Sequence, residues 1–334
     1  MSITAKFLTG LLCLIGCIIN SGSIHGQTCG TPDHYWQNGL YENLRTISDR
    51  PEGASSRSSY ELKLVFHIVR HPSDRYISDA VVHEQIATLN RAFSVEDRQL
   101  HSLAQEFEPL LPQRDRTISF CLAERKNNGN LEKGIVRKST TVEAIGIDGE
   151  RMLSATEGSV PWAQDSFVNI WVVGLGGNLL GYASYPDSTL SAKDGIAIDP
   201  AYFGTNSSDG YDLGKVLVHE MGHYLGLSHP WGDCSGEGDG IEDTPAQDRP
   251  YNGCPTYPQV SCSSNDLYQN YMDYVDDRCM VKFTQGQYQA MQLAIELLRP
   301  SLIGVQHCYQ WRSLEPRFER VSQSGLWYGF TSKN

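Results

Sequence analysis

The sequence predicts an α+β fold, in which strands and helices are mixed along the chain. Two hydrophobic patterns support this prediction. Residues 62–69 form a short β-rich run, whereas residues 79–93 repeat apolar side chains at helical spacing. Clusters of Gly, Pro and Asp separate such segments. At 334 residues the chain can bury a substantial core in one large domain or two modest ones.

The amino-terminal half is expected to alternate between strands and a helix. After the strand at 62–69, the helix at 79–93 carries Val82, Ile86, Leu89 and Phe93 on one face. Further strands are expected at 118–122, 168–173 and 195–198. The chain shows no internal repeat and no low-complexity tract.

The carboxy-terminal half is expected to hold two helices around a long loop. The first spans 213–225, with Asp209 and Asp212 as candidate caps and Gly226 at its end. A loop rich in Gly, Asp and Cys runs from 228 to about 270. The last helix spans 284–298, before Pro300.

Residues 1–26 have the pattern of an export signal. Lys6 precedes an apolar run from 7 to 19, and small or polar residues follow up to Gly26. No segment reaches the roughly 20 apolar residues that a membrane-spanning helix needs. A secreted protein without a membrane span is therefore expected. An ordinary signal-peptidase cut is favoured over a lipobox ending at Cys17, which would add a lipid anchor.

The segment after the signal, residues 27–56, is polar and turn-rich and predicts a pro-segment. A folded domain is expected over 57–310 and a tail over 311–334. The chain has 27 Lys+Arg against 39 Asp+Glu, a net charge of -12. This balance argues against general binding to nucleic acid or to anionic membranes.

The cysteine count is odd once the signal is removed. Of the nine cysteines, Cys13 and Cys17 belong to the signal, so seven remain. In an oxidising compartment six can form three disulfides, and one thiol is left for another task.

The segment His219-Glu220-Met221-Gly222-His223 lies inside the helix expected at 213–225. Side chains four positions apart share one helix face, so both imidazoles can reach one metal ion. The pattern alone arises by chance in about one chain of this length in a hundred. Gly226 and then His229 follow, and the extended pattern has a chance rate below roughly one in ten thousand.

Chemistry explains this spacing. A helix offers two ligands, and a glycine lets the chain turn so that the third, His229, approaches from another side. Three neutral histidines leave one position on a zinc ion for water, whose proton the adjacent Glu220 can accept. A closed structural zinc site would more often recruit cysteine. The residues therefore predict a hydrolytic zinc site.

The extended histidine pattern with a downstream methionine turn is the metzincin signature. More specifically, the sequence resembles the pappalysin family of zinc metallopeptidases, including ulilysin-like and mirolysin-like members. The resemblance rests on HEMGHYLGLSHPWGDC, GDGIEDTP, NYMDYVDDRC and FTQGQYQAM, and it spans most of residues 62–300. It implies a metzincin-type fold with a twisted mixed sheet, an active-site helix and a carboxy-terminal subdomain carrying the Met-turn.

The resemblance also implies roles for three residues of NYMDYVDD. Met272 would form the hydrophobic floor under the zinc. Tyr274 would steady the oxyanion that forms during hydrolysis. Asp277 would lie at the base of the pocket that follows the cleaved bond, where it would favour Arg or Lys. Protein or peptide substrates are therefore expected.

A calcium site is implied by the acidic loop 238–244. Asp239 and Thr244 would offer side chains, and carbonyls near Gly238 and Glu242 would complete the shell. Oxygen ligands suit calcium, although the spacing is not that of an EF-hand and an ordinary turn is the alternative.

Family pairing implies disulfides Cys234–Cys262 and Cys254–Cys279. Cys121 and Cys308 are then a further candidate pair that no motif supports. Cys29, in Cys29-Gly30-Thr31, resembles the family's latency motif, in which a thiolate binds the catalytic zinc. Gln27 stands where that motif has arginine.

A switch of this kind is released when the pro-segment is cut. The basic preference expected from Asp277 predicts cleavage at Ser56-Arg57, and the enzyme itself is a candidate for making this cut.

Two rivals to an endopeptidase follow from the same residues. One is a secreted binding protein that keeps the zinc fold without turnover, although such a protein would not need Glu220. The other is a zinc hydrolase acting on non-peptide amides or esters, which the metal ligands alone do not exclude.

Overall fold

The computed structural model describes residues 28–31, 59–94, 103–112, 117–186, 191–205, 210–232, 234, 238–303 and 308. Several expectations lie outside these residues. They are the signal at 1–26 with Cys17, the position of Gln27, the cut at Ser56-Arg57, the cap Asp209 and the tail at 311–334.

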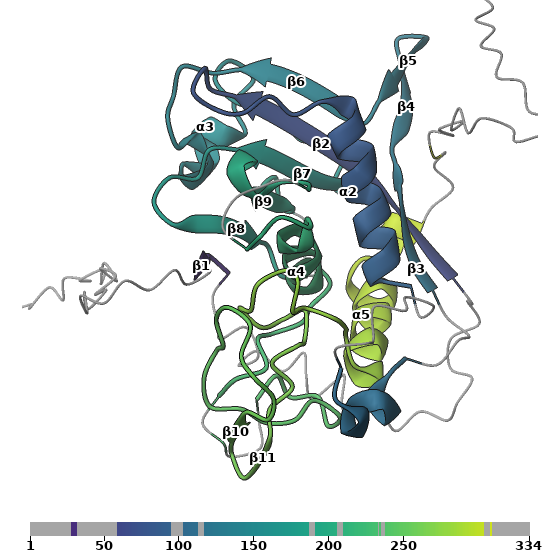
Figure 1. Ribbon diagram of the computed structural model, residues 1–334. Helices are drawn as coiled ribbons and strands as arrows, with labels where there is room; N and C mark the ends of the chain where they lie inside the picture. Colours follow the sequence, from purple (N-terminus) through teal and green to yellow (C-terminus); the bar gives the residue numbers. More distant parts are fainter. Residues whose placement is uncertain are drawn as a thin grey trace, which may run out of the picture.

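A seven-stranded mixed sheet forms the upper part of the molecule in Figure 1. Its order is β1-β8-β9-β7-β2-β3, and β6 also pairs with β2. All pairings are parallel except that of β8 with β9. The strands are β1 (Thr28–Cys29), β2 (Ser59–Arg70), β3 (Thr117–Leu122), β6 (Ile135–Ser139), β7 (Val168–Val173), β8 (Leu179–Ala183) and β9 (Ile196–Ile198).

The long strand β2 is the centre of the sheet. One edge pairs with β7 between Leu64 and Val69, and the other edge pairs with β3 and then β6. Every residue of β2 from Leu62 to Val69 is buried. A parallel strand covered on both faces requires such a continuous run, and this explains why β2 was recognisable in the sequence.

The edge strand β8 carries the amino-terminal segment. β1 pairs with it in parallel, with Thr28 opposite Leu179 and Cys29 opposite Gly181. The backbone N–H of Gly30 also donates to the carbonyl of Gly181 at 2.9 Å. Figure 1 shows β1 beside β8 and next to the helix α4.

Three helices match the expected ones. α2 (Asp79–Ala92) and α4 (Lys215–Tyr224) contact each other and cover the same face of the sheet. α5 (Gln285–Leu298) lies below them in Figure 1 and begins with a capping box between Thr284 and Gln287. Gly226, with φ of 97°, follows the end of α4 as expected.

The cap expected for α4 was wrong. The N-cap is Gly214, with φ of 75° and no side-chain cap bond, rather than Asp212. The side chain of Asp277, from a distant turn, replaces the expected cap. Its Oδ2 accepts from the N–H of Leu213 at 2.8 Å and from that of Lys215 at 3.0 Å. Such a long-range partner for the first N–H groups of a helix leaves no signal near the helix in the sequence.

Like the sheet strands β1, β6 and β8, the remaining elements were not expected from the sequence. They are short and depend on turns and tertiary contacts rather than on hydrophobic periodicity. They are β4 (Glu124–Asn127), β5 (Asn130–Lys133), α3 (Gly149–Met152), β10 (Val260–Ser261), β11 (Ser264–Asn265) and the 3₁₀ turns η3 (Gln105–Leu110), η4 (Ile145–Ile147), η5 (Pro200–Tyr202) and η6 (Pro300–Ile303).

A buried ion pair joins α4, the segment before β9 and the end of α5. Arg299 binds Asp194 through two nitrogen–oxygen contacts of 2.6 and 2.8 Å. Tyr224 donates its hydroxyl to the same carboxylate, and the Arg299 guanidinium stacks 3.7 Å from the Tyr224 ring. This network fixes the end of α4 relative to the segment that leads into β9.

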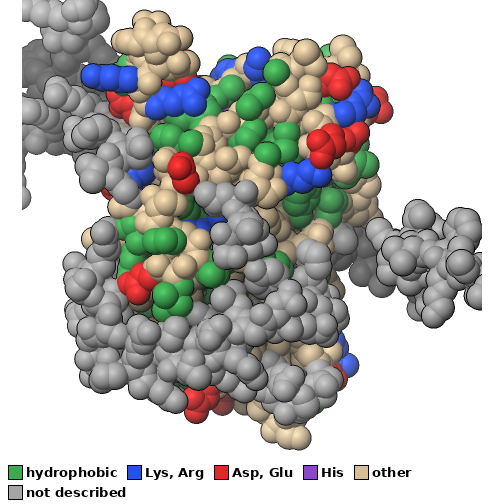
Figure 2. All heavy atoms as spheres, turned by 180° about the vertical axis from the view of Figure 1, so that it is seen from behind, with side chains coloured by type: hydrophobic (Ala, Val, Ile, Leu, Met, Phe, Trp, Pro, Cys, Tyr) green, Lys and Arg blue, Asp and Glu red, His purple; other side chains and the backbone are tan. Residues whose placement is uncertain are grey.

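The face opposite to that of Figure 1 is shown in Figure 2. In its upper part Lys and Arg side chains are interspersed with Asp and Glu, and no histidine is visible among the residues drawn in colour. Within the described residues, no helix has the length and apolar character needed to cross a membrane.

Candidate active site

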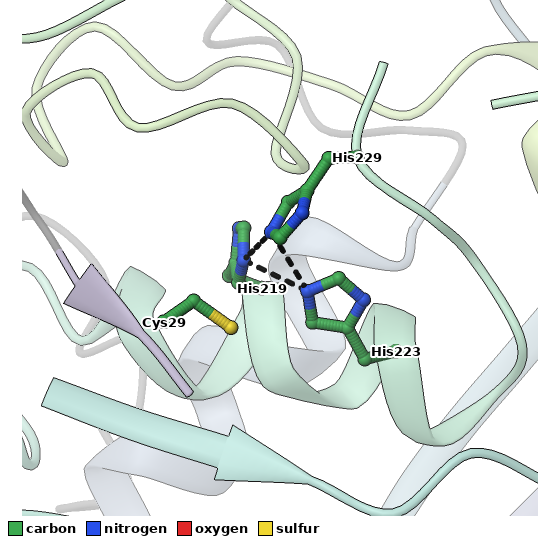
Figure 3. Close-up of side chains that lie close together, drawn as sticks. All are labelled: Cys29, His219, His223 and His229. Atoms are coloured by element: carbon green, nitrogen blue, oxygen red, sulfur yellow. Dashed lines mark hydrogen bonds between the residues drawn. The ribbon is translucent and has the colours of Figure 1, made fainter. Parts of the chain in front are cut away.

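α4 and the turn that follows it bring three histidines together (Figure 3). His219 and His223 lie one turn apart on α4, and Gly226 turns the chain so that His229 faces them. The Nε2 atoms are 3.1, 3.1 and 3.3 Å apart. Three nitrogens bound tetrahedrally to zinc at about 2.0–2.1 Å would be about 3.3 Å apart. The triangle therefore has the size of one face of a zinc site.

Hydrogen bonds to the backbone orient two of these rings. The Nδ1 of His219 lies 2.8 Å from the carbonyl of Tyr271, and the Nδ1 of His223 lies 2.7 Å from that of Leu227. A carbonyl accepts only, so each Nδ1 carries the proton and each Nε2 keeps its lone pair. Nε2 atoms that face one another in this state do not hydrogen-bond. They fit a shared cation.

The electrostatics agree with neutral imidazoles. Burial lowers the pKa of His223 and of His229 well below the usual value, and the neighbouring histidines lower both further. Neutral imidazole is the form that ligates metals.

Glu220 is fully buried and follows His219 on α4. Its Oε1 has no hydrogen-bond partner among the described residues. Burial raises the pKa of this carboxyl to about 8, although hydrogen bonds from Cys29 and Thr31 lower it in part. Gly181 on β8 leaves space for the Glu220 side chain, since a Cβ at Gly181 would lie 3.0 Å from Glu220 Cγ.

The amino-terminal segment reaches into the same site. The Sγ of Cys29 and the histidine nitrogens all lie within 4.8 Å of one another. Thr31 donates its hydroxyl to Glu220 Oε2 at 3.2 Å, and the same hydroxyl accepts from the N–H of Ala183 at 3.0 Å. Cys29 Sγ lies 3.6 Å from Glu220 Oε2. This segment therefore covers both the histidines and the carboxylate.

The turn at 270–274 packs against the histidines. Met272 is fully buried, and a Cβ at Gly222 would lie only 2.3 Å from its Sδ, so α4 needs glycine at this contact. The Tyr274 ring lies 5.0 Å from that of His229 and 5.7 Å from that of His219. The structure thus places both residues beside the three histidines.

Asp277 is fully buried at the amino-terminal end of α4. Oδ2 is bound to backbone N–H groups, whereas Oδ1 has no hydrogen-bond partner among the described residues. Burial raises the pKa of this carboxyl to about 6, against the opposing effect of the N–H groups of Lys215 and Leu213.

The residues of the expected calcium loop lie near the start of α5. Asp239 is buried, and its carboxylate accepts from the N–H of Ile241 and from Gln287 Nε2, both at 2.9 Å. Burial raises the pKa of Asp239 to about 7. The Thr244 hydroxyl lies 3.4 Å from that of Thr284. Glu242 is exposed, and Gly238 has φ of 24°.

The structure contains three disulfides: Cys121–Cys308, Cys234–Cys262 and Cys254–Cys279. The last two are the pairs that the resemblance implies, and the first is the candidate pair without a motif. Cys29 is the free cysteine among the described residues.

Sequence reasoning did not single out Thr31 or Trp231, which both lie near the site. Thr31 contacts Glu220, and Trp231 stacks on His229 with ring centroids 4.2 Å apart. Thr31 lies two residues after Cys29, and Trp231 lies two residues after His229. This closeness in sequence to a predicted site residue was the signal that could have identified them.

Comparison with known proteins agrees with this site. A family model described as pregnancy-associated plasma protein-A matches residues 158–296. An extracellular metalloprotease of Verticillium alfalfae is 33% identical over 247 residues, covering 70% of this chain and 75% of its own length. Extracellular metalloprotease 1 of Coccidioides posadasii is 30% identical, covering 78% of this chain and 86% of its own.

Solved structures from Tannerella forsythia match as well. Mature mirolysin in complex with a cleaved peptide has a TM-score of 0.68 and 35% identity, over 74% of this chain and 96% of its own. A mutant of promirolysin has a TM-score of 0.72 and 31% identity, over 83% of this chain and 97% of its own.

The mixed sheet and the histidine site define a metallopeptidase with the metzincin fold of mirolysin. The chain belongs to the pappalysin family, in which membership implies zinc.

Proposed function

We propose that this chain is a secreted zinc endopeptidase that is made as a latent zymogen. The observation that carries the proposal is the triangle of Nε2 atoms, 3.1 to 3.3 Å on each side, with the buried Glu220 next to it. Secretion is supported by relatives that are named extracellular metalloproteases.

His219, His223 and His229 would hold the zinc ion. When bound, zinc supplies a Lewis acid and lowers the pKa of its water towards neutrality. Glu220 would accept the proton of the attacking water and return it to the leaving amine. Tyr274 would donate its hydroxyl to the carbonyl oxygen as negative charge develops there. Met272 would keep the underside of the site apolar.

The substrate would lie along β8. Gly181 offers a carbonyl and Ala183 an N–H on this edge, and Gly30 and Thr31 occupy both groups in the precursor. A peptide that replaces this segment can use the same groups, because an exposed strand edge binds extended chains. The scissile bond would then pass Glu220.

Latency would come from Cys29. Burial and the nearby Glu220 carboxylate raise the pKa of its thiol, whereas a divalent cation deprotonates a coordinating thiol outright. Thiolate binding to zinc would exclude the water. The match to promirolysin extends over a larger share of this chain, 83% against 74% for the mature enzyme. Cleavage at Ser56-Arg57 would release the segment and define a catalytic domain over 57–310.

Asp277 would select Arg or Lys after the cleaved bond. Its Oδ1 is buried without a hydrogen-bond partner among the described residues, while Oδ2 is held by two N–H groups. A guanidinium or ammonium group would satisfy the free oxygen.

Sequencing of the products from a peptide mixture would test both the class and the preference. Cleavage before Arg and Lys is expected, and Asp277→Asn should reduce this preference about ten- to hundredfold in kcat/KM, since hydrogen bonds to charged groups contribute ~1.5–3 kcal/mol. Because the pKa of Asp277 is about 6, the preference should rise as the pH increases through 6.

Asn is chosen at position 277 because its side-chain oxygen can still accept from the N–H groups at the start of α4. Asp276→Asn is the matched control, since Asp276 is the neighbouring acid and pairs with Arg278 at 3.3 Å. Equal loss of preference in both variants would rule out the role of Asp277.

A calcium ion would bind near Asp239 and Thr244, with carbonyls near Gly238 and Glu242. Support comes from Asp239, which is buried without a cationic partner among the described residues and lies close enough to Asp243 for its pKa to rise further. An ion bound there would stabilise the fold.

Saturating calcium is expected to raise the Tm of the metal-stripped protein by about 5 °C, as a ligand at 100 times its Kd adds ~2.7 kcal/mol. Asp239→Asn should remove this rise. Zinc chloride added alone is the control for the catalytic site. A Tm that does not respond to calcium would eliminate the calcium site.

The two rivals make different predictions for substrates. Membership in a family of metalloproteases disfavours a binding protein without turnover. Digestion of casein by the processed protein separates an endopeptidase from a hydrolase limited to small amides or esters.

A further inference from the structure

The ring of Trp231 packs against the ring of His229, the third histidine of the site. The two rings are stacked, with centroids 4.2 Å apart and planes 9° apart. The ring of Tyr274 meets Trp231 edge-on at 4.8 Å and meets His229 edge-on at 5.0 Å. Trp231 therefore contacts both a metal-binding ring and the tyrosine next to it.

The three histidines are supported differently. His219 and His223 lie on α4, where the helix backbone fixes their Cα atoms. His229 lies beyond the helix, after the turn at Gly226. A loop residue needs other contacts to hold its ring, because terminal torsions of histidine have broad minima. The parallel stack with Trp231 restricts rotation of the His229 ring.

Trp231 is itself tied to the turn that carries Tyr274. It forms a parallel bridge with Gln247, and the N–H of Gly232 donates to the Gln247 carbonyl at 2.8 Å. Gln247 Nε2 donates to Asp273 Oδ2 at 2.7 Å, and Asp273 Oδ1 accepts from the N–H of Tyr274 at 2.7 Å. Gln247 and Asp273 are fully buried, so this link is shielded from water.

We infer that Trp231 is a positioning residue that sets the ring of His229 for metal binding and the ring of Tyr274 for the reaction. The second part rests on the proposed peptidase function, whereas the first part concerns the metal alone. Loss of the stack would remove one contact that orients the His229 ring towards the Nε2 triangle. Groups that orient metal-binding histidines typically change metal affinity or activity 10–100-fold when they are removed.

The first test measures zinc affinity in the full chain, with Cys29→Ser in every variant so that no thiol competes for the metal. Trp231→Leu keeps an apolar side chain but removes the stack, and it should raise the zinc Kd at least about tenfold in competition with a chromophoric chelator. Trp231→Phe keeps an aromatic ring and should stay within about threefold of the parent. The visible spectrum of the cobalt-substituted protein should shift for the leucine variant only.

Trp162→Leu is the matched control. Trp162 is buried, whereas Trp231 is half-buried, and Trp162 packs on Phe167 and Arg125 rather than on the three histidines. If it weakens zinc binding as much as Trp231→Leu at a similar loss of Tm, the effect is general destabilisation and the inference fails. An unchanged zinc Kd and cobalt spectrum in Trp231→Leu would also overturn it.

The second test uses kinetics of the processed enzyme at saturating zinc. Trp231→Leu should lower kcat about tenfold with KM within about twofold, because a displaced Tyr274 weakens stabilisation of the transition state rather than substrate binding. An unchanged kcat would overturn the role towards Tyr274. If the parent cleaves no peptide, the proposed function fails, while the zinc measurement still decides the role towards His229.

Discussion

Replacing Glu220 by alanine is expected to reduce kcat for peptide cleavage by about 10²–10⁴-fold, the usual contribution of a positioned general base. Glu220 is buried beside the histidines, and its Oε1 has no hydrogen-bond partner among the described residues. Among the described residues its carboxylate hydrogen-bonds with Cys29 and Thr31 and not with the three histidines, so zinc content should remain at one ion per chain. Cleavage assays and metal analysis of the same preparation measure the two properties.

Glu132→Ala is a suitable control for this experiment, because Glu132 lies on β5 and pairs with Arg125 in a surface salt bridge. It should leave kcat unchanged. The Glu220→Ala precursor should also fail to cut itself at Ser56-Arg57, and continued processing by the purified variant would rule out self-activation. Retention of more than about one tenth of the parent activity would contradict the role of Glu220.

Replacing Cys29 by serine is expected to raise the activity of the uncut precursor at least about tenfold. Cys29 Sγ lies within 4.8 Å of all three histidine nitrogens, and serine is a poorer zinc ligand than a thiolate. A tenfold effect corresponds to a loss of only about 1.4 kcal/mol of blocking free energy. Hydrolysis of a short fluorogenic peptide by the intact precursor measures it.

Thr31 should contribute a smaller part of the same block. Thr31→Val removes the hydroxyl that donates to Glu220 and should raise precursor activity about two- to tenfold, as one hydrogen bond contributes ~0.5–1.5 kcal/mol. Thr31→Ser keeps the hydroxyl and should behave like the parent. If Cys29→Ser and Thr31→Val both leave the precursor as inactive as before, latency resides elsewhere.

The parts of the fold with strong hydrophobic patterns were predictable. β2 and β7 are runs of buried residues, and α2 and α5 show helical spacing with recognisable ends. β1, β4, β5, β6 and β8 were missed because they are short and are defined by the strands with which they pair. The cap of α4 was predicted incorrectly because Asp277, which accepts from the N–H of Lys215 at the start of the helix, comes from a distant turn.

The site was predictable where local geometry dictates it. The spacing of His219 and His223 follows from one helical turn, and Gly226 explains how His229 returns to them. The contacts of Thr31 and Trp231 were not predictable, because they join residues far apart in the chain or on an irregular loop. The sequence analysis expected Asp277 only in a substrate pocket. Its hydrogen bonds with the N–H groups of Leu213 and Lys215 were not expected.

The most direct test of the proposed centre is X-ray absorption at the zinc edge, recorded on the intact precursor and on Cys29→Ser. The precursor should show three nitrogen ligands at about 2.0–2.1 Å and one sulfur at about 2.3 Å, and the variant should replace only the sulfur by oxygen. Fewer than three nitrogens in both samples, or an unchanged spectrum after Cys29→Ser, would contradict a zinc ion shared by His219, His223 and His229 and blocked by Cys29.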